Sequence, residues 1–122
     1  MLEVKESKYG RGVFATRDIQ KGELLDASPI IVVPHEEYKY LKKTVLSNYV
    51  FWWGKNDKAR AVALGYGSLF NHSYTPNAKY KFKRKTDTIN FYAYTDIKAG
   101  EEILVNYNGD PDDQSPVWFE VL

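Results

Sequence analysis

The sequence predicts a single, mainly β domain in which small sheets are accompanied by one short helix. With 122 residues, the chain is long enough for one modest hydrophobic core. Short apolar stretches recur along it, and Gly, Asp and Pro separate them, which is the pattern of brief strands joined by turns. Only one stretch spaces its apolar residues as a helix does.

Several segments are rich enough in apolar and aromatic residues to be predicted as strands. They are residues 13–15, 24–27, 30–33, 49–53, 59–64, 78–82, 88–94 and 103–105. Polar turns at 54–57 and 84–87 separate two pairs of them, so we expect two hairpins. Alternation along 78–82 puts Tyr80 on the inner face and the neighbouring lysines on the outer face.

The helix is predicted over residues 35–46. Pro34 precedes it, and two glutamates, Glu36 and Glu37, fall in its first turn. Two lysines fall near its end, so the charges at both ends oppose the helix macrodipole and favour this register. The buried stripe of the helix would consist of Tyr38, Leu41 and Val45.

A short pattern occurs twice, at residues 15–23 and again at 93–101. Ala, Asp, Ile, Gly and Glu match at one offset. Because Gly supplies the positive φ that a tight turn needs, both copies are predicted to form a strand–turn–strand corner. We predict that this repeated pattern has a structural role and takes no part in the functional site.

The composition argues against several classes of function. The net charge of +1 creates no global field that would favour nucleic acid or a membrane surface. The chain has no Cys, which excludes disulfides, thiolate catalysis and cysteine-bound zinc, and its two histidines are too isolated to predict a metal centre. The first twenty residues contain no apolar run, so we expect neither a signal peptide nor a membrane span. We therefore expect a protein that is not secreted, cytoplasmic if bacterial and otherwise nuclear or cytoplasmic.

Three short motifs carry the candidate chemistry. The first is Tyr9-Gly10-Arg11-Gly12-Val13-Phe14, in which glycines allow the backbone to approach a ligand and present N–H groups to a carboxylate that Arg11 could also pair with. Taken alone, it reads as a plain surface turn. The second runs from Ser68 to Asn77 and contains Asn71-His72-Ser73, whose polar groups can bracket an adenine or an ammonium group. The third runs from Glu101 to Tyr107 and ends an apolar strand with a tyrosine.

Together and in this order, the motifs resemble the signature of the SET domain, a family that transfers a methyl group from S-adenosylmethionine to a lysine of a protein. The resemblance covers residues 9–107 and implies a β-clip fold of curved sheets with a knot-like C-terminal segment. That threading would bring Asn71 and His72 beside Tyr107. Residues 1–122 would form one SET-like domain, with the core at 9–107 and a tail at 108–122 that closes the active site.

The resemblance also implies roles for individual residues. S-adenosylmethionine would be the cofactor, with no metal, and its binding residues would be Gly10, Arg11, Gly12, Tyr49, Asn71, His72 and Trp118. Tyr107 would be the catalytic residue, placed beside the lysine amine. Tyr66, Tyr80 and Tyr107 would line the substrate channel, although for Tyr49 and Tyr66 a simple core role is equally compatible with the sequence.

Methyl transfer to a lysine gives a physical reason for an aromatic channel around the lysine side chain. Lysine has an ordinary pKa of about 10.4, so most of it is protonated near neutral pH and is not nucleophilic. A narrow apolar channel desolvates the ammonium group and lowers that pKa, and the positive charge of the donor acts in the same direction. The hydroxyl of Tyr107 could then orient the neutral amine, and no strong general base is needed.

The chain departs from the family pattern at its C-terminal end. Many members carry zinc-binding cysteines there, whereas this chain has Tyr74 where Cys is frequent and Asn106 where an acidic residue is usual. We expect Trp118 or Phe119 to fold back over the donor in place of a zinc-bound tail. The departures around Tyr74 and after Tyr107 leave a catalytically inactive SET-fold module that binds a protein or peptide as the alternative function.

The partners follow from these expectations. The substrate would be a protein with an exposed lysine, histone-like or another basic protein. Lysines at 79, 81, 83 and 85 form a charged face that could contact nucleic acid, but we favour protection of an edge strand against aggregation. The many aromatic residues are compatible with a homodimer.

Overall fold

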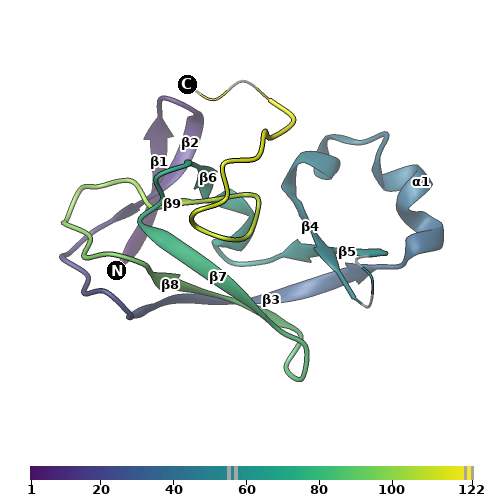
Figure 1. Cartoon of the computed structure of the whole chain (residues 1–122), viewed down its shortest axis with the longest axis horizontal. Helices are drawn as coiled ribbons and strands as arrows, with labels where there is room; N and C mark the ends of the chain where they lie inside the picture. The colour runs from purple at the N-terminus through teal and green to yellow at the C-terminus, as the bar shows by residue number, and fades with distance from the viewer. Residues whose placement is uncertain (55, 57, 120, 122) are drawn as a thin grey trace.

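A computed structural model describes residues 1–54, 56, 58–119 and 121 of the chain (Figure 1). Its strands are β1 (Leu2–Ser7), β2 (Gly10–Ala15), β3 (Leu24–Val33), β4 (Val50–Trp53), β5 (Ala59–Ala63), β6 (Asn71–His72), β7 (Ala78–Lys83), β8 (Thr88–Ala93) and β9 (Leu104–Val105). Within the described residues they form three sheets, namely the hairpin β1–β2, a five-stranded sheet in the order β4-β5-β3-β8-β7, and the parallel pair β6–β9. The mainly β prediction with small sheets is confirmed.

The five-stranded sheet is strongly curled. In a flat sheet, edge strands four spacings apart would be separated by roughly 19 Å. Here the edge strands β4 and β7 touch through their side chains, with ring centroids of Phe51 and Tyr80 5.3 Å apart and those of Trp53 and Phe82 5.4 Å apart. The two free edges of the sheet therefore face each other across its concave side.

The strand β3 is longer than predicted because it continues through Pro29. Its first half pairs with β8 up to Pro29, and its second half pairs with β5 from Ile30 onward. Proline has no N–H to donate, and here it lies where the pairing passes from one neighbour to the other. The predicted break between 27 and 30 is therefore wrong.

The predicted helix is mostly absent. The α-helix α1 spans only Tyr38–Leu41, and 3-10 turns at His35–Glu37 and Val45–Tyr49 flank it. Of the predicted stripe, Leu41 is buried, whereas Val45 is 70% exposed. Thr44 adopts an extended conformation and its hydroxyl donates to the carbonyl of Leu41 at 2.8 Å, which ends the helix. Favourable charges were not sufficient because the stripe has little core to cover.

Two further predictions concern the chain's turns. The turn at 84–87 is confirmed, since Thr86 donates to the carbonyl of Lys83 and Asp87 has a φ of 50°. Of the predicted turn at 54–57, Lys55 and Asp57 lie outside the described residues.

The strand β1 was not predicted because four of its six residues are exposed and it has no apolar face to read.

The two copies of the repeated pattern pair with each other. Ile19 and Ile97 exchange backbone hydrogen bonds of 2.7 and 2.8 Å, and both side chains are buried. The carboxylate of Asp18 accepts from the N–H of Ala99, and that of Asp96 accepts from the N–H of Lys21, at equivalent places. The repeated pattern thus forms the same type of corner twice, and the two copies are related by near two-fold symmetry.

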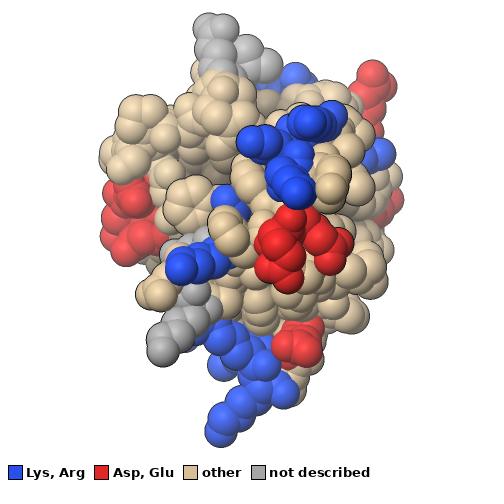
Figure 2. All heavy atoms as spheres, turned by 90° about the vertical axis from the view of Figure 1, so that its right-hand side faces the viewer, with Lys and Arg blue, Asp and Glu red and all other residues tan. Residues whose placement is uncertain are grey.

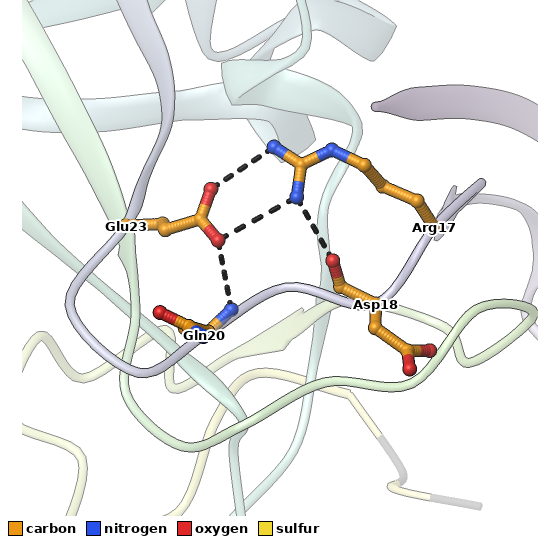
Figure 3. Close-up of polar contacts among 4 residues, drawn as sticks. All are labelled: Arg17, Asp18, Gln20 and Glu23. Carbon is orange, nitrogen blue, oxygen red and sulfur yellow. Dashed lines mark hydrogen bonds and ion pairs between the residues drawn. The ribbon is translucent and has the colours of Figure 1, made fainter.

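One copy also carries a surface ion pair (Figure 3). The guanidinium of Arg17 donates to Glu23 at 3.0 Å and to the carbonyl of Asp18 at 2.8 Å. The same carboxylate accepts from the N–H of Gln20 at 2.9 Å. The hydrogen bond from Arg17, and after it the one from Gln20, lowers the pKa of Glu23 below its usual range. The carboxylate of Glu23 therefore stays ionised and keeps its contacts with both residues.

The short pair β6–β9 joins distant parts of the chain. Asn71 pairs with Leu104 and His72 with Val105, in parallel. Asn77 extends the junction, because its side chain accepts from the N–H of Leu104 and donates to the carbonyl of Glu102. The second and third motifs are therefore adjacent, while the knot-like threading stays a prediction.

The surface charge is mixed. On the end of the molecule that carries α1, basic and acidic side chains are interspersed rather than segregated (Figure 2), in keeping with the net charge of +1. Among the described helices, none is long and apolar enough to cross a membrane.

Candidate active site

A cavity of about 770 Å³ lies on the concave side of the curled sheet. The edge strand β4 contributes Phe51 and Trp52 to its wall, and the opposite edge strand β7 contributes Tyr80 and Phe82. None of the described residues that line it carries a charge. An aromatic, uncharged cavity of this kind is suited to the aliphatic stem of a lysine and to a desolvated amine.

Tyr107 lies where the cavity meets the β6–β9 pair. Its hydroxyl donates to the carbonyl of Phe70 at 2.6 Å, and its N–H donates to Nδ1 of His72 at 2.9 Å. Burial, followed by the nearby Tyr80, Tyr49 and Glu102, raises the pKa of Tyr107 far above its ordinary value. The phenol is therefore neutral at any physiological pH, and it offers its oxygen lone pair to a ligand because its proton is engaged by Phe70.

Tyr80 lines the cavity and packs against the core, on the inner face that the alternation of β7 predicted. Its hydroxyl donates to the carbonyl of Tyr107 at 3.4 Å, and burial raises its pKa to about 12. Tyr49 also lines the cavity. Tyr66 does not belong to the described lining; its ring packs against the core and its hydroxyl donates to the carbonyl of Leu2 at 3.4 Å.

Of the residues predicted to hold the methyl donor, Arg11, Gly12 and Asn71 lie together, whereas Tyr49 and Trp118 line the cavity instead. The side-chain amide of Asn71 donates to the carbonyl of Arg11 and to Glu102, both at 2.8 Å. Because the amide nitrogen makes both of these bonds, the orientation of the amide is determined. Its oxygen can then accept a hydrogen bond from a ligand. A Cβ at Gly12 would collide with the carboxylate of Glu102 and lie 2.9 Å from the Asn71 nitrogen, so any larger residue would displace these two side chains.

The first glycine and the arginine of this motif are more open. Gly10 has a φ of 106°, which favours glycine, and a Cβ there would meet no atom within 4 Å. The side chain of Arg11 is exposed. The structure thus joins Arg11 to Asn71 through a hydrogen bond, places Gly12 close to Asn71 and Glu102, and leaves Gly10 and the Arg11 side chain exposed.

His72 is buried, with 3% of its surface exposed. Its Nδ1 accepts from Tyr107, so in the neutral ring Nε2 carries the hydrogen. That Nε2 has no hydrogen-bond partner among the described residues. Burial lowers the pKa of His72, which keeps the ring neutral and the tautomer defined.

The C-terminal tail folds back onto the site. The indole of Trp118 stacks on the ring of Tyr107, with centroids 5.6 Å apart and planes 17° apart. Phe119 meets His72 and Tyr107 edge-on at 6.0 and 5.9 Å. Trp118 lines the cavity together with Pro116 and Val117. The predicted fold-back of the tail is therefore seen, while contact with a donor stays a prediction.

Several residues of the site were not predicted from the sequence. Glu102 and Phe70 lie within the quoted motifs, yet their roles as anchors of Asn71 and Tyr107 depend on contacts across the fold. Trp52, which is 61% exposed at an edge strand, and Phe82, which is 37% exposed, belong to the cavity wall. The available signal for Phe82 was an aromatic residue between two lysines, whereas Trp52 lies in an apolar run that gave no signal of its own.

Comparison with known proteins agrees with this geometry. The family model described as SET domain matches residues 10–108. The chain is 35% identical over 121 residues to a histone-lysine N-methyltransferase of Schizosaccharomyces pombe named as H3 lysine-37 specific, covering 98% of this chain and 77% of that protein. It is 31% identical over 109 residues to the H3 lysine-36 specific histone-lysine N-methyltransferase of Homo sapiens, covering 81% of this chain and 4% of that protein.

Solved structures give the same result. Polycomb Repressive Complex 2 of Chaetomium thermophilum, in an autoinhibited conformation bound to S-adenosylmethionine, matches with a TM-score of 0.72 and 26% identity. The match covers 87% of this chain and 15% of that one. From the family match, the relatives and the shared fold, we conclude that this chain belongs to the SET domain family and, with it, to the protein-lysine N-methyltransferases.

Proposed function

We propose that the domain transfers a methyl group from S-adenosylmethionine to the ε-amine of a lysine in a histone-like protein substrate. The observation that carries the proposal is the uncharged aromatic cavity that ends at the hydroxyl of Tyr107. The relatives named for lysines of histone H3 support the choice of substrate class.

The residues on the donor side fit S-adenosylmethionine. Asn71 is oriented by Arg11 and Glu102 so that its amide oxygen can accept from an ammonium group. The Gly10–Gly12 segment opens β2 beside Asn71, and its glycines let the backbone approach a ligand closely. The buried Nε2–H of His72, which has no partner among the described residues, is a donor for an acceptor on the ligand. When bound, S-adenosylmethionine supplies an electrophilic methyl group on a positively charged sulfur.

The chain's own residues prepare the amine. The aromatic wall removes water from the ammonium group of the substrate, which lowers its pKa and lets its proton leave to solvent. The hydroxyl of Tyr107 donates to Phe70 and therefore accepts an N–H of the neutral amine, which aims the nitrogen lone pair. The phenol itself stays protonated because burial raises its pKa. Tyr107 thus acts by orientation and exclusion of water and not as a base.

A basic segment around the target lysine suits the surroundings of the cavity. Asp110 and Asp112 are exposed, and Asp110 follows directly on Gly109, which lines the cavity. Exposed carboxylates beside the opening attract a positively charged peptide and raise its association rate at low salt.

The test is transfer of radiolabelled methyl from S-adenosylmethionine to a mixture of histones and other basic proteins. Wild type is compared with Asn71→Ala and Tyr107→Phe, and Asn90→Ala serves as a matched control because its bonds to Thr88 and Tyr92 lie on β8. We expect methyl-lysine from wild type and the control alone. Binding of a lysine peptide without binding of the donor and without transfer would contradict the proposal and favour a binding module.

A further inference from the structure

The tail after β9 has little regular structure, yet side-chain amides bind its backbone. The side chain of Asn106, which is 2% exposed, donates to the carbonyls of Asp113 at 2.7 Å and Pro111 at 3.4 Å. The side chain of Asn108 donates to the carbonyls of Ser115 at 2.7 Å and Asp113 at 3.4 Å. The oxygen of Asn106 in turn accepts from the N–H of Asn108 at 3.0 Å. The two asparagines on either side of Tyr107 therefore bind the same stretch of tail.

A second attachment lies farther along the tail, at Tyr74. The side chain of Gln114 donates to the carbonyl of Tyr74 at 3.1 Å, and the N–H of Val117 donates to its hydroxyl at 3.3 Å. The ring of Tyr74 packs edge-on against His72, with centroids 4.5 Å apart. The tail is thus tied to both sides of the β6–β9 pair.

These attachments determine where Trp118 lies. Between the amide contacts and the indole, Pro116 and Val117 line the cavity, and Trp118 then stacks on Tyr107. Trp118 is itself 63% exposed, so burial of the indole alone is a weak reason for it to stay there. The polar contacts of the preceding residues supply the restraint that the indole lacks.

We propose that Asn106 and Asn108 form an amide clamp that positions the tail, and through it Trp118, as one wall of the lysine channel. The chemistry requires the amide form, because both nitrogens donate to carbonyl oxygens. A carboxylate at either place would set like partial charges against each other and give no donor. The two asparagines are positioning residues for the proposed methyl transfer, and the inference rests on that function where it concerns the substrate.

The first measurement needs no activity. Hydrogen exchange of the tail amides is compared in wild type, Asn108→Asp, Asn106→Asp and the control Asn90→Asp, which adds the same charge on β8. We expect exchange over residues 110–118 to become about tenfold faster in both clamp variants, with the other strands unchanged, because a hydrogen bond is worth about one decade in an opening equilibrium. Unchanged exchange in Asn108→Asp, which is less buried and whose side-chain hydrogen bonds go to the tail, would overturn the proposal.

The second measurement tests the route through Trp118. With a peptide substrate, Asn108→Asp should raise KM several-fold and leave kcat within about twofold, and Trp118→Ala should do the same. In the double variant the two effects should not add, because both remove the same wall. Additive effects would mean that Asn108 acts elsewhere and would refute the inference. A wild type that transfers no methyl would refute the proposed function, while the exchange experiment still decides whether the clamp exists.

Discussion

Replacement of Tyr107 by Phe removes one hydroxyl and keeps the ring, so it separates orientation of the amine from the shape of the cavity. The lost hydroxyl donates to the carbonyl of Phe70 at 2.6 Å. Loss of one such bond, with the carbonyl left without a donor, costs about 1.5 kcal/mol of stability. For a chain of this length that amounts to a fall in melting temperature of about 6 °C.

The effect on catalysis should be larger. Without the hydroxyl, the amine loses the group that aims its lone pair, and misplacement of a reacting atom by about 1 Å costs roughly 100-fold in rate. We therefore expect kcat to fall about 100-fold in Tyr107→Phe. The affinity for S-adenosylmethionine should stay within about twofold, because the ring and the N–H of residue 107 that binds His72 remain.

Three measurements on the same preparation check this reasoning. Thermal unfolding by circular dichroism gives the change in stability, calorimetry gives donor affinity, and mass spectrometry of a peptide substrate gives kcat. A variant that turns over within about threefold of wild type would refute the assignment of Tyr107. A variant that loses donor affinity to the same extent as kcat would show that the residue acts on the donor side instead.

Three other perturbations test separate parts of the site. Gly12→Ala places a Cβ against the carboxylate of Glu102 and the amide of Asn71, so we expect S-adenosylmethionine affinity to fall at least tenfold by calorimetry; an unchanged affinity would contradict a donor-side role. Tyr80→Phe removes a hydroxyl from the cavity wall and should shift the distribution of mono-, di- and trimethyl products in mass spectra with a loss of rate below about tenfold; an identical distribution would contradict a substrate-side role. Burial lowers the pKa of His72, so the unfolded chain binds a proton that the folded chain does not. Stability against urea should therefore be full above about pH 6.5, the unfolded value, and decline as the pH falls below it, and His72→Asn should flatten that slope.

Local patterns in the sequence predicted most of the strands because alternation and turn residues act over short distances. The hairpin of β7 and β8 with its turn at 84–87 follows from such signals, and so does the inward direction of Tyr80. The helix at 35–46 was predicted too long: α1 covers only Tyr38–Leu41, because Leu41 is the buried residue of the predicted stripe while Val45 is exposed. Helix stability comes mainly from the apolar face that is covered, which a local pattern does not reveal.

The sequence by itself determined which candidate residues are present and in what order: a glycine pair, an asparagine–histidine pair and the tyrosine that follows β9. Only the tertiary structure decided how they meet. The curl of the sheet brings β4 to β7 and creates the cavity, and the parallel pairing of β6 with β9 puts His72 against Tyr107 across 35 positions of sequence. The tertiary structure also brings the side chains of Asn106 and Asn108 to the carbonyls of the tail. Such contacts depend on long-range packing and pairing, whose free energy is shared by many residues and leaves no local periodicity to read.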